Sequence, residues 1–454
     1  MAPPSTAQAA ATPSERPRRA WLRSAEALPP AARKPLEYSI LYTATLCLLA
    51  VGAVMVYSAS SAESLLAGTG DPSYFLKRYA LYGAVGLLAL HALSRGGLRV
   101  ALRFTPLLVL VGFALTALVL VPGVGLEVNG ASRWLGAGPV RFQPSEILKV
   151  ALVLYAARLL ASRPRGLRTF SGLCKPLLLV VGAACVLLLG QPDMGTAIVV
   201  CLSIGSLMVA AGARIGHLGA IAGALSALAF VVAWVEPYRR ERLTAFVDPW
   251  ADAAGSGFQS VQAMIAIGSG GLLGNGLGES VQKIFYLPEA HTDMILAIVG
   301  EEMGALGILA VVALYALVAY AGLRAAKGAR DAYGALVAAG ITSLVLCQAV
   351  LNLFAVMGLA PLTGVPLPFI SFGNSNMVVL LAAMGILLDV ASGGTIPARL
   401  GRTAPRRAPA GAGSAKRAQT ASRRAAARDP RDGRGGRDRR PRGAGPRGGR
   451  RAAS

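Results

Sequence analysis

Six ionisable side chains lie within twenty residues of a chain that is otherwise mostly apolar. Carboxylates and an imidazole at this density suit general acid–base chemistry or the binding of a divalent cation. An apolar run follows at once, and acidic groups that border a membrane span are costly and usually functional. The six residues are Lys283, Glu289, His291, Asp293, Glu301 and Glu302.

The residues alone leave three interpretations of this stretch open. It is a catalytic site, a relay for transport, or a polar loop on which Thr292 or Asp293 caps the helix that enters the membrane. A residue that caps a helix needs no catalytic role. The density of ionisable side chains nevertheless favours a functional site over a simple helix cap.

Two further polar clusters border apolar runs. In the first, Ser145 is expected to cap a helix whose first turn carries Glu146 and Lys149 on one face, where they either pair or line a cavity. In the second, Asp193 is expected to cap the helix that follows the turn 191–195.

A third cluster contains Arg239, Arg240 and Arg242. Guanidinium groups near a membrane surface suit a phosphate or pyrophosphate group. The alternative is that this segment anchors the chain at the interface through Tyr238 and Trp250.

Membrane spans are the elements that must position these clusters. The chain has 454 residues, 54% of them hydrophobic and only 15% charged. Its long apolar runs predict an all-α, polytopic membrane protein. Ten transmembrane helices are expected, at about residues 39–59, 79–93, 105–121, 145–161, 176–190, 197–211, 218–235, 304–323, 333–356 and 374–390.

The distribution of charge predicts the topology. Residues 1–35 carry six basic and two acidic side chains, and residues 393–454 carry eighteen and three, so the two tails hold most of the net charge of +23. Segment 236–302 carries four basic and nine acidic side chains. The positive-inside rule therefore places both tails in the cytoplasm and the large loop 236–292, between spans seven and eight, outside.

Three regions follow from this pattern: a membrane domain at 37–391 and basic tails at 1–36 and 392–454. The tails hold too few large apolar residues to build a core and are expected to be disordered. A solvated C-terminal tail is the simplest interpretation, and binding to anionic headgroups is an alternative. RNA binding is a weaker alternative, and no nucleic-acid partner is expected.

Signatures of soluble enzymes are missing from the sequence: it contains no Walker A, GxSxG or HExxH motif. A reaction at the clusters would therefore need a substrate that is already activated when it arrives in the membrane. This restriction favours lipid-linked donors.

Six short motifs occur in a fixed order: Tyr57-Ser-Ala-Ser60, Asn129-Gly-Ala-Ser-Arg-Trp134, Phe142-Gln-Pro-Ser-Glu146 with Lys149, Gln191-Pro-Asp-Met-Gly195, Tyr286-Leu-Pro-Glu-Ala-His-Thr-Asp293 and Gly300-Glu-Glu302. Any one of them is weak evidence. Together they make residues 38–390 resemble the SEDS family of membrane proteins, the FtsW/RodA/SpoVE group. The stretch 288–302 is more similar to the cell-division members than to the elongation members.

The resemblance implies a peptidoglycan glycosyltransferase that polymerises lipid II at the outer face of the cytoplasmic membrane, at the division septum. It also implies that Asp293 is the catalytic acidic residue. The implied partners are a class B penicillin-binding protein, which is a transpeptidase, other division proteins and membrane lipids. One motif departs from the usual Ser-Tyr-Gly-Gly-Ser-Ser, because this chain reads Ser371-Phe372-Gly373-Asn374-Ser375-Asn376. The lost tyrosine hydroxyl and glycine change hydrogen bonding and backbone freedom.

The implied reaction is a single inverting displacement, for which Asp293 would be the general base. Partial burial would raise the pKa of its carboxyl group. Charge on the leaving pyrophosphate would be met by Arg133, Lys149 and the arginines Arg239, Arg240 and Arg242. A divalent cation, Mg²⁺ or Mn²⁺, held by carboxylates such as Glu289 and Asp293 is the alternative. The residues expected to shape the cavity and hold substrate are Glu146, Asp193, Lys283, Glu289 and His291.

Three rival functions stay open. A lipid II flippase would use the polar groups as a pathway through the membrane, but they concentrate near the predicted outer side. The other two are an elongation-type polymerase and a non-catalytic division scaffold, which the altered motif 371–376 keeps open.

Overall fold

The computed structural model describes residues 35–66, 70–128, 131–137, 140–162, 170–213, 215–216, 218–220, 222–223, 234 and 237–396. Most of these residues are helical. Five of the helices among them are long and apolar enough to cross a membrane. The chain is therefore an integral membrane protein built mainly of helices. The five are α1 (Leu36–Leu66), α3 (Gly97–Val119), α10 (Ile295–Gly328), α11 (Ala332–Val356) and α12 (Asn374–Ala391).

Other expected spans have helices at their positions. These are α2 (Tyr74–Leu93), α4 (Pro144–Ser162), α5 (Phe170–Gly190) and α6 (Met194–Ala210). Several helices are longer than the predicted spans, because hydropathy reports only the apolar length and helices continue into polar surroundings. The expected span 218–235 and both tails beyond residues 35 and 396 lie mostly or wholly outside the described residues.

Helix α4 lies inside the bundle, where it contacts α3, α5, α6, α11 and α12. Most of its side chains are buried, and they include the charged pair Glu146 and Lys149. Because protein rather than lipid surrounds α4, this helix can carry charge at membrane depth. The prediction that Ser145 caps it is wrong: the helix already begins at Pro144, and the fixed φ of proline suits the first helical position.

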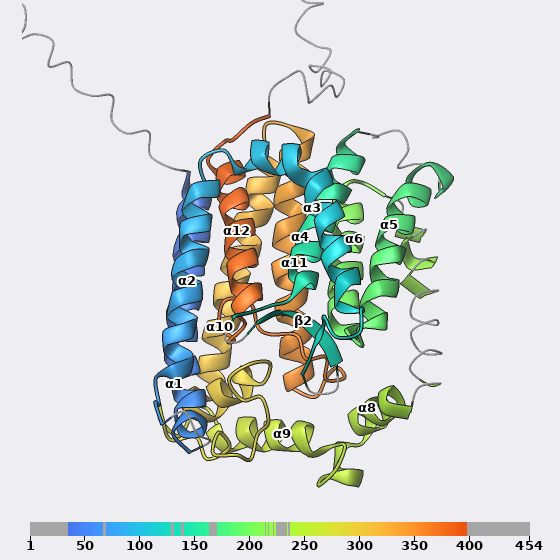
Figure 1. Ribbon diagram of the computed structural model, residues 1–454. Coiled ribbons are helices and arrows are strands. Elements are labelled where there is room, and N and C mark those ends of the chain that lie inside the picture. The colour runs from blue at the N-terminus through green and yellow to red at the C-terminus, as the bar shows by residue number, and fades with distance from the viewer. Residues whose placement is uncertain are drawn as a thin grey trace, which may run out of the picture. The chain divides into compact units, whose positions relative to one another are not determined.

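A small antiparallel sheet replaces part of the loop expected between α3 and α4, so the described chain is not purely α-helical. Its strands β1 (Leu126–Val128), β2 (Ala131–Ala137) and β3 (Val140–Phe142) pair in the order β1-β2-β3. Strands β1 and β3 have only three residues each, which is too short to show an alternating pattern in the sequence. Figure 1 shows β2 at the same end of the helices as α8 and α9, and we call this end the sheet end.

The segment expected to be a large loop contains short helices. These are α8 (Pro237–Val247), a 3-10 helix η2 (Pro249–Asp252) and α9 (Phe258–Gly270). Figure 1 shows α8 and α9 across the sheet end. Turns then lead from residue 271 to α10, which begins well before the expected residue 304.

Helix α10 is broken at Gly304, whose φ of 66° and ψ of −165° are not helical. This backbone conformation is accessible essentially only to glycine. The break leaves amides and carbonyls on both sides without their helical partners, and segment 271–276 supplies replacements. The bonds are Ala305 N to Gly271 O (2.9 Å), Leu306 N to Leu272 O (3.2 Å), Asn275 N to Glu301 O (3.0 Å) and Gly276 N to Glu302 O (3.1 Å).

We expect Gly304→Ala to destabilise the protein by about 1–3 kcal/mol, because alanine strains this backbone conformation. An added Cβ would also lie only 2.5 Å from Gly274 N and from Leu272 O. The measurement is the thermal midpoint of the purified protein in detergent. Gly182→Ala is the matched control, since a Cβ there meets open space within α5. An equal effect of both variants would contradict this account of the break.

Candidate active site

Asp293 lies in a tight turn directly before α10. Its carboxylate and that of Glu289 share one neighbour: Thr292 Oγ1 lies 3.3 Å from Asp293 Oδ1 and 2.7 Å from Glu289 Oε2. The prediction that Thr292 or Asp293 caps the helix is wrong, because Met294 is the N-cap residue and no side chain caps it. The amides of Thr292 and Met294 instead donate to the Glu289 carbonyl, at 3.1 and 3.3 Å, so the turn closes on itself.

The two carboxylates offer the oxygen donors that a hard divalent cation prefers. Within the described ranges, no three His, Cys, Asp or Glu side chains gather closely enough to hold a metal ion by themselves. Glu289 and Asp293 therefore fit only the kind of Mg²⁺ site in which one or two carboxylates share the ion with the phosphates of a substrate.

The backbone of Asp293 is held by a side chain from another helix. Asn352 of α11 is buried, and its Nδ2 donates to Asp293 O at 2.7 Å and to Val365 O at 2.9 Å. Beside Val365, Gly364 has a φ of 67°, and a Cβ on it would lie 3.9 Å from Asp293 Oδ2. A segment between α11 and α12 thus lies against the Asp293 carboxylate.

Asp193 caps α6, as predicted. Its Oδ1 accepts from Thr196 N at 3.2 Å. The other carboxylate oxygen, Oδ2, accepts from Gln143 Nε2 at 3.2 Å and from Ser145 Oγ at 3.4 Å. Asp193 therefore also ties the start of α6 to the start of α4.

The segment from Thr363 to Val365 joins the surroundings of the two aspartates. A Cβ on Gly195 would lie 2.6 Å from Thr363 O and 2.5 Å from Val365 Cγ2, so the start of α6 packs directly on this segment. Its other side lies against Asp293, as described above. Asp193 and Asp293 are thus held on one scaffold although they are far apart in the sequence.

Glu146 and Lys149 pair, which was one of the two predicted arrangements. Glu146 Oε2 lies 2.9 Å from Lys149 Nζ, and both side chains are at most 2% exposed. Gln348 Oε1 accepts from Lys149 at 3.1 Å, and Asn376 Nδ2 donates to Glu146 at 3.0 Å. Asn376 is the last residue of the motif 371–376, which differs from the usual family sequence. The amide of Asn376 is thus a direct part of this buried network.

A second buried ion pair lies at the base of the loop that leads to Asp293. Lys283 Nζ lies 2.9 Å from Glu302 Oε1, and Ser58 Oγ of α1 donates to the same oxygen at 2.6 Å. Next to it, Glu301 accepts from the turn at 280–282. The two glutamates thus fasten this loop to α10 and α1.

His291 is buried between aromatic rings. Its ring centroid lies 4.3 Å from that of Phe75 and 5.7 Å from that of Phe372, the residue that replaces the usual tyrosine. Its Nδ1 lies 3.3 Å from Glu63 Oε2 of α1, which makes an ion pair when the imidazole is protonated. The position of His291 suits holding the loop against α1 and α2.

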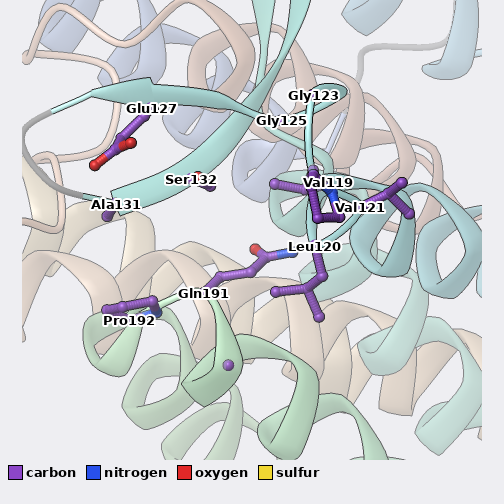
Figure 2. A pocket seen from close by; sticks show the side chains of 12 residues that line it. Val119, Leu120, Val121, Gly123, Gly125, Glu127, Ala131, Ser132, Gln191 and Pro192 are labelled. Atoms are coloured by element: carbon purple, nitrogen blue, oxygen red, sulfur yellow. The ribbon is translucent and has the colours of Figure 1, made fainter.

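Arg133 of β2 donates through Nε to Gln191 O at 3.2 Å and through Nη2 to Pro192 O. The turn that it holds forms one wall of a pocket of about 470 Å³. Figure 2 shows Gln191 and Pro192 on one side of this pocket and Glu127 and Ser132 on the other. Neither Asp293 nor the Glu146–Lys149 pair lines it, so this pocket does not contain the candidate catalytic carboxylate.

The arginine cluster is described only in part. The backbones of Arg239 and Arg242 lie in α8, but their side chains lie outside the described part of the structure. Arg240 is exposed, with its guanidinium 5.0 Å from the centroid of the Trp234 ring.

Among the residues of these networks for which the sequence predicts no role are Ser58, Gln348 and Asn352. The two amides are four residues apart and lie on one face of α11. Polar side chains inside an apolar span are themselves a signal of function. Their partners, however, lie on segments that only the fold brings near.

The amino-acid sequence of this chain is similar to those of a known protein family. The family model described as "Cell cycle protein", which covers FtsW, RodA and SpoVE, matches residues 39–395. A probable peptidoglycan glycosyltransferase FtsW from Thioalkalivibrio sulfidiphilus is 44% identical over 359 residues, which cover 77% of this chain and 88% of that protein. The stage V sporulation protein E of Bacillus subtilis is 39% identical over 352 residues, which cover 77% of this chain and 96% of that protein.

Solved structures are similar as well. A chain of a peptidoglycan synthase complex that coordinates polymerization and crosslinking aligns with a TM-score of 0.64 at 29% identity, covering 77% of this chain and 96% of that one. The rod shape determining protein RodA of Thermus thermophilus aligns with a TM-score of 0.57 at 28% identity, covering 77% and 95%. The family model spans most of the chain, and the chain belongs to the FtsW/RodA/SpoVE family.

Proposed function

We propose that this protein is a peptidoglycan glycosyltransferase that polymerises lipid II into glycan strands during cell division. The observation that carries the proposal is the half-buried carboxylate of Asp293, which a rigid scaffold holds at the sheet end of a membrane helix bundle. The likeness to relatives named FtsW supports the reaction, and it favours division over elongation.

The reaction needs one proton acceptor and a stabilised leaving group. The 4-hydroxyl oxygen of the incoming lipid II bonds to the anomeric carbon of the growing strand, and the bond from that carbon to the pyrophosphate oxygen breaks. The bonding electron pair leaves with the undecaprenyl pyrophosphate. Asp293 accepts the hydroxyl proton, and a base in this position typically accelerates the reaction by about 10²–10⁴-fold.

The structure divides the predicted cationic site residues into two groups. Lys149 and Lys283 are buried against glutamates, and Arg133 donates to backbone carbonyls. These three suit positioning better than binding a mobile diphosphate. The arginines of α8 are therefore our candidates for the leaving group. A divalent cation on Glu289 and Asp293 would supply the same charge stabilisation.

The proposed setting is a ten-span topology with both tails in the cytoplasm and the sheet end outside. The acidic balance of segment 236–302 and the basic tails support it. We propose a class B penicillin-binding protein as the partner, since a similar chain occurs in a peptidoglycan synthase complex. The proposed location is the division septum, which a fluorescent fusion to the full chain would test against the side wall.

The test of the activity is polymerisation by the full chain, purified together with its transpeptidase partner and given labelled lipid II. The transpeptidase active site is blocked, so that strands accumulate without crosslinks. Long glycan strands support the proposal. Transbilayer movement of lipid II in liposomes without any strands would support a flippase instead. If the protein neither polymerises lipid II nor moves it across the bilayer, but still binds its partner, only the scaffold role is left.

A further inference from the structure

Asn352 links two segments that regular secondary structure does not hold. Its side chain is 1% exposed and lies within the apolar helix α11. The amide nitrogen carries two hydrogens, and it donates to Asp293 O and to Val365 O at 2.7 and 2.9 Å. Since both neighbours are carbonyl oxygens, only the nitrogen end of the amide can face them.

The chain around Asp293 does not fix this residue through a helix cap. Met294 is the N-cap of α10 and its side chain caps nothing, and Ala297 N bonds to Met294 O. The Asp293 carbonyl is instead tied to α11, a different helix. On the other side, the bond to Val365 fixes the backbone whose Gly364 faces the Asp293 carboxylate.

Gln348 strengthens the same connection one helical turn earlier. Its Nε2 donates to Pro366 O at 2.9 Å, while its Oε1 accepts from Lys149 at 3.1 Å. Two amides on one face of α11 therefore bind consecutive carbonyls, those of Val365 and Pro366. This leaves the segment 363–366 little freedom to move relative to α11.

We propose that Asn352 is a positioning residue for glycan transfer, because its amide holds the Asp293 carboxylate against segment 363–365. This inference rests on the proposed function. Asn352 does not touch the reacting atoms, so it acts only through the placement of Asp293. A displacement of about 1 Å at a reacting group costs on the order of 10²-fold in rate.

Asparagine is needed here for a reason that a single substitution can test. Aspartate has nearly the same shape, but it would place a carboxylate where two carbonyl oxygens now accept hydrogen bonds. Asn352→Asp therefore removes both donors and repels both segments. Asn352→Ala removes the donors without adding charge. The matched control is Asn275→Asp, which adds the same charge at an exposed side chain.

The experiment measures kcat and KM for lipid II with the full chain and its transpeptidase partner, together with the thermal midpoint of each variant. We expect kcat of Asn352→Asp to fall by about 10²-fold with KM unchanged, a smaller fall for Asn352→Ala, and wild-type values for Asn275→Asp. Because KM reports substrate binding and kcat the placement of the base, this split is not expected from a purely structural residue.

Wild-type kcat in both Asn352 variants would overturn the proposal, and so would a rise in KM at constant kcat. A loss of kcat no larger than the loss of folded protein would also overturn it. If Asn352→Asp does not fold, Asn352→Ala decides. If the wild type itself makes no strands, the proposed function fails. If the wild type polymerises and the variants equal it, only the positioning role fails.

Discussion

Replacing Asp293 by asparagine is expected to slow glycan polymerisation by about 10²–10⁴-fold. The amide of asparagine cannot accept the proton of the attacking hydroxyl at neutral pH. Its shape is nearly that of aspartate, and the bond from Asn352 goes to the backbone carbonyl, which the substitution leaves in place. The variant should therefore fold and bind its partner normally.

The measurement is the initial rate of strand formation from labelled lipid II, with folding checked by the thermal midpoint. Glu279→Gln is the matched control, because Glu279 is an exposed acid that precedes Asp293 on the same loop. A full rate in Asp293→Asn would refute the assignment of the base.

The variant Glu289→Gln distinguishes between two roles of Asp293, that of a general base and that of a ligand to a divalent cation. If Asp293 acts only as a base, loss of the Glu289 carboxylate should have a small effect. If the two carboxylates share a cation, both variants should lose activity, and excess Mg²⁺ or Mn²⁺ should partly restore Glu289→Gln. The shared neighbour Thr292 already shows that the two carboxylates lie close enough for this comparison to be informative.

The starting residues of some helices are predictable because clear local sequence signals mark them. The apolar run of α11 starts after Asp331, whose side chain accepts from Gly334 N at 2.7 Å, and α12 follows directly after Gly373. A capping aspartate and a glycine are among the clearest boundary signals in a sequence. Both helices accordingly begin within a residue of their predicted positions.

The break in α10 is not predictable in this way. Gly304 follows Glu301-Glu302-Met303 and begins an apolar run, but glycine is common in membrane helices without breaking them. What makes the break stable is the segment 271–276, which replaces the lost backbone bonds. That segment lies about thirty residues earlier in the chain. The sequence around Gly304 contains no signal that the two segments form hydrogen bonds.

In the candidate site, too, contacts within one helix are predictable and contacts between distant segments are not. Glu146 and Lys149 are three residues apart on one helix, so their pairing follows from helical geometry. Asn352 and Asp293 are 59 residues apart, and their contact depends on how α10, α11 and the segment before α12 pack. Sequence reasoning therefore finds the acidic groups but misses the amides that hold them.

Lys149→Met should reduce the free energy of unfolding by about 3–5 kcal/mol, because it leaves the Glu146 carboxylate buried without its counter-ion. The side chain of Glu146 is only 2% exposed, so water cannot replace the lost charge. Lys77→Met is the control, since the Lys77–Asp71 pair has a similar distance of 2.7 Å but an exposed lysine. Exposed pairs contribute little, so the control should unfold like the wild type.

The double variant Glu146→Gln/Lys149→Met tests whether the loss comes from the unpaired charge. Removing both charges together avoids a buried carboxylate, and glutamine can still accept the bond from Asn376 Nδ2 that Glu146 now accepts. Much of the stability should therefore return, although each single variant is destabilised. Thermal or denaturant unfolding of the four proteins in detergent gives the coupling energy. Purely additive losses would mean that packing, and not charge pairing, determines how α4 tolerates these groups within the bundle.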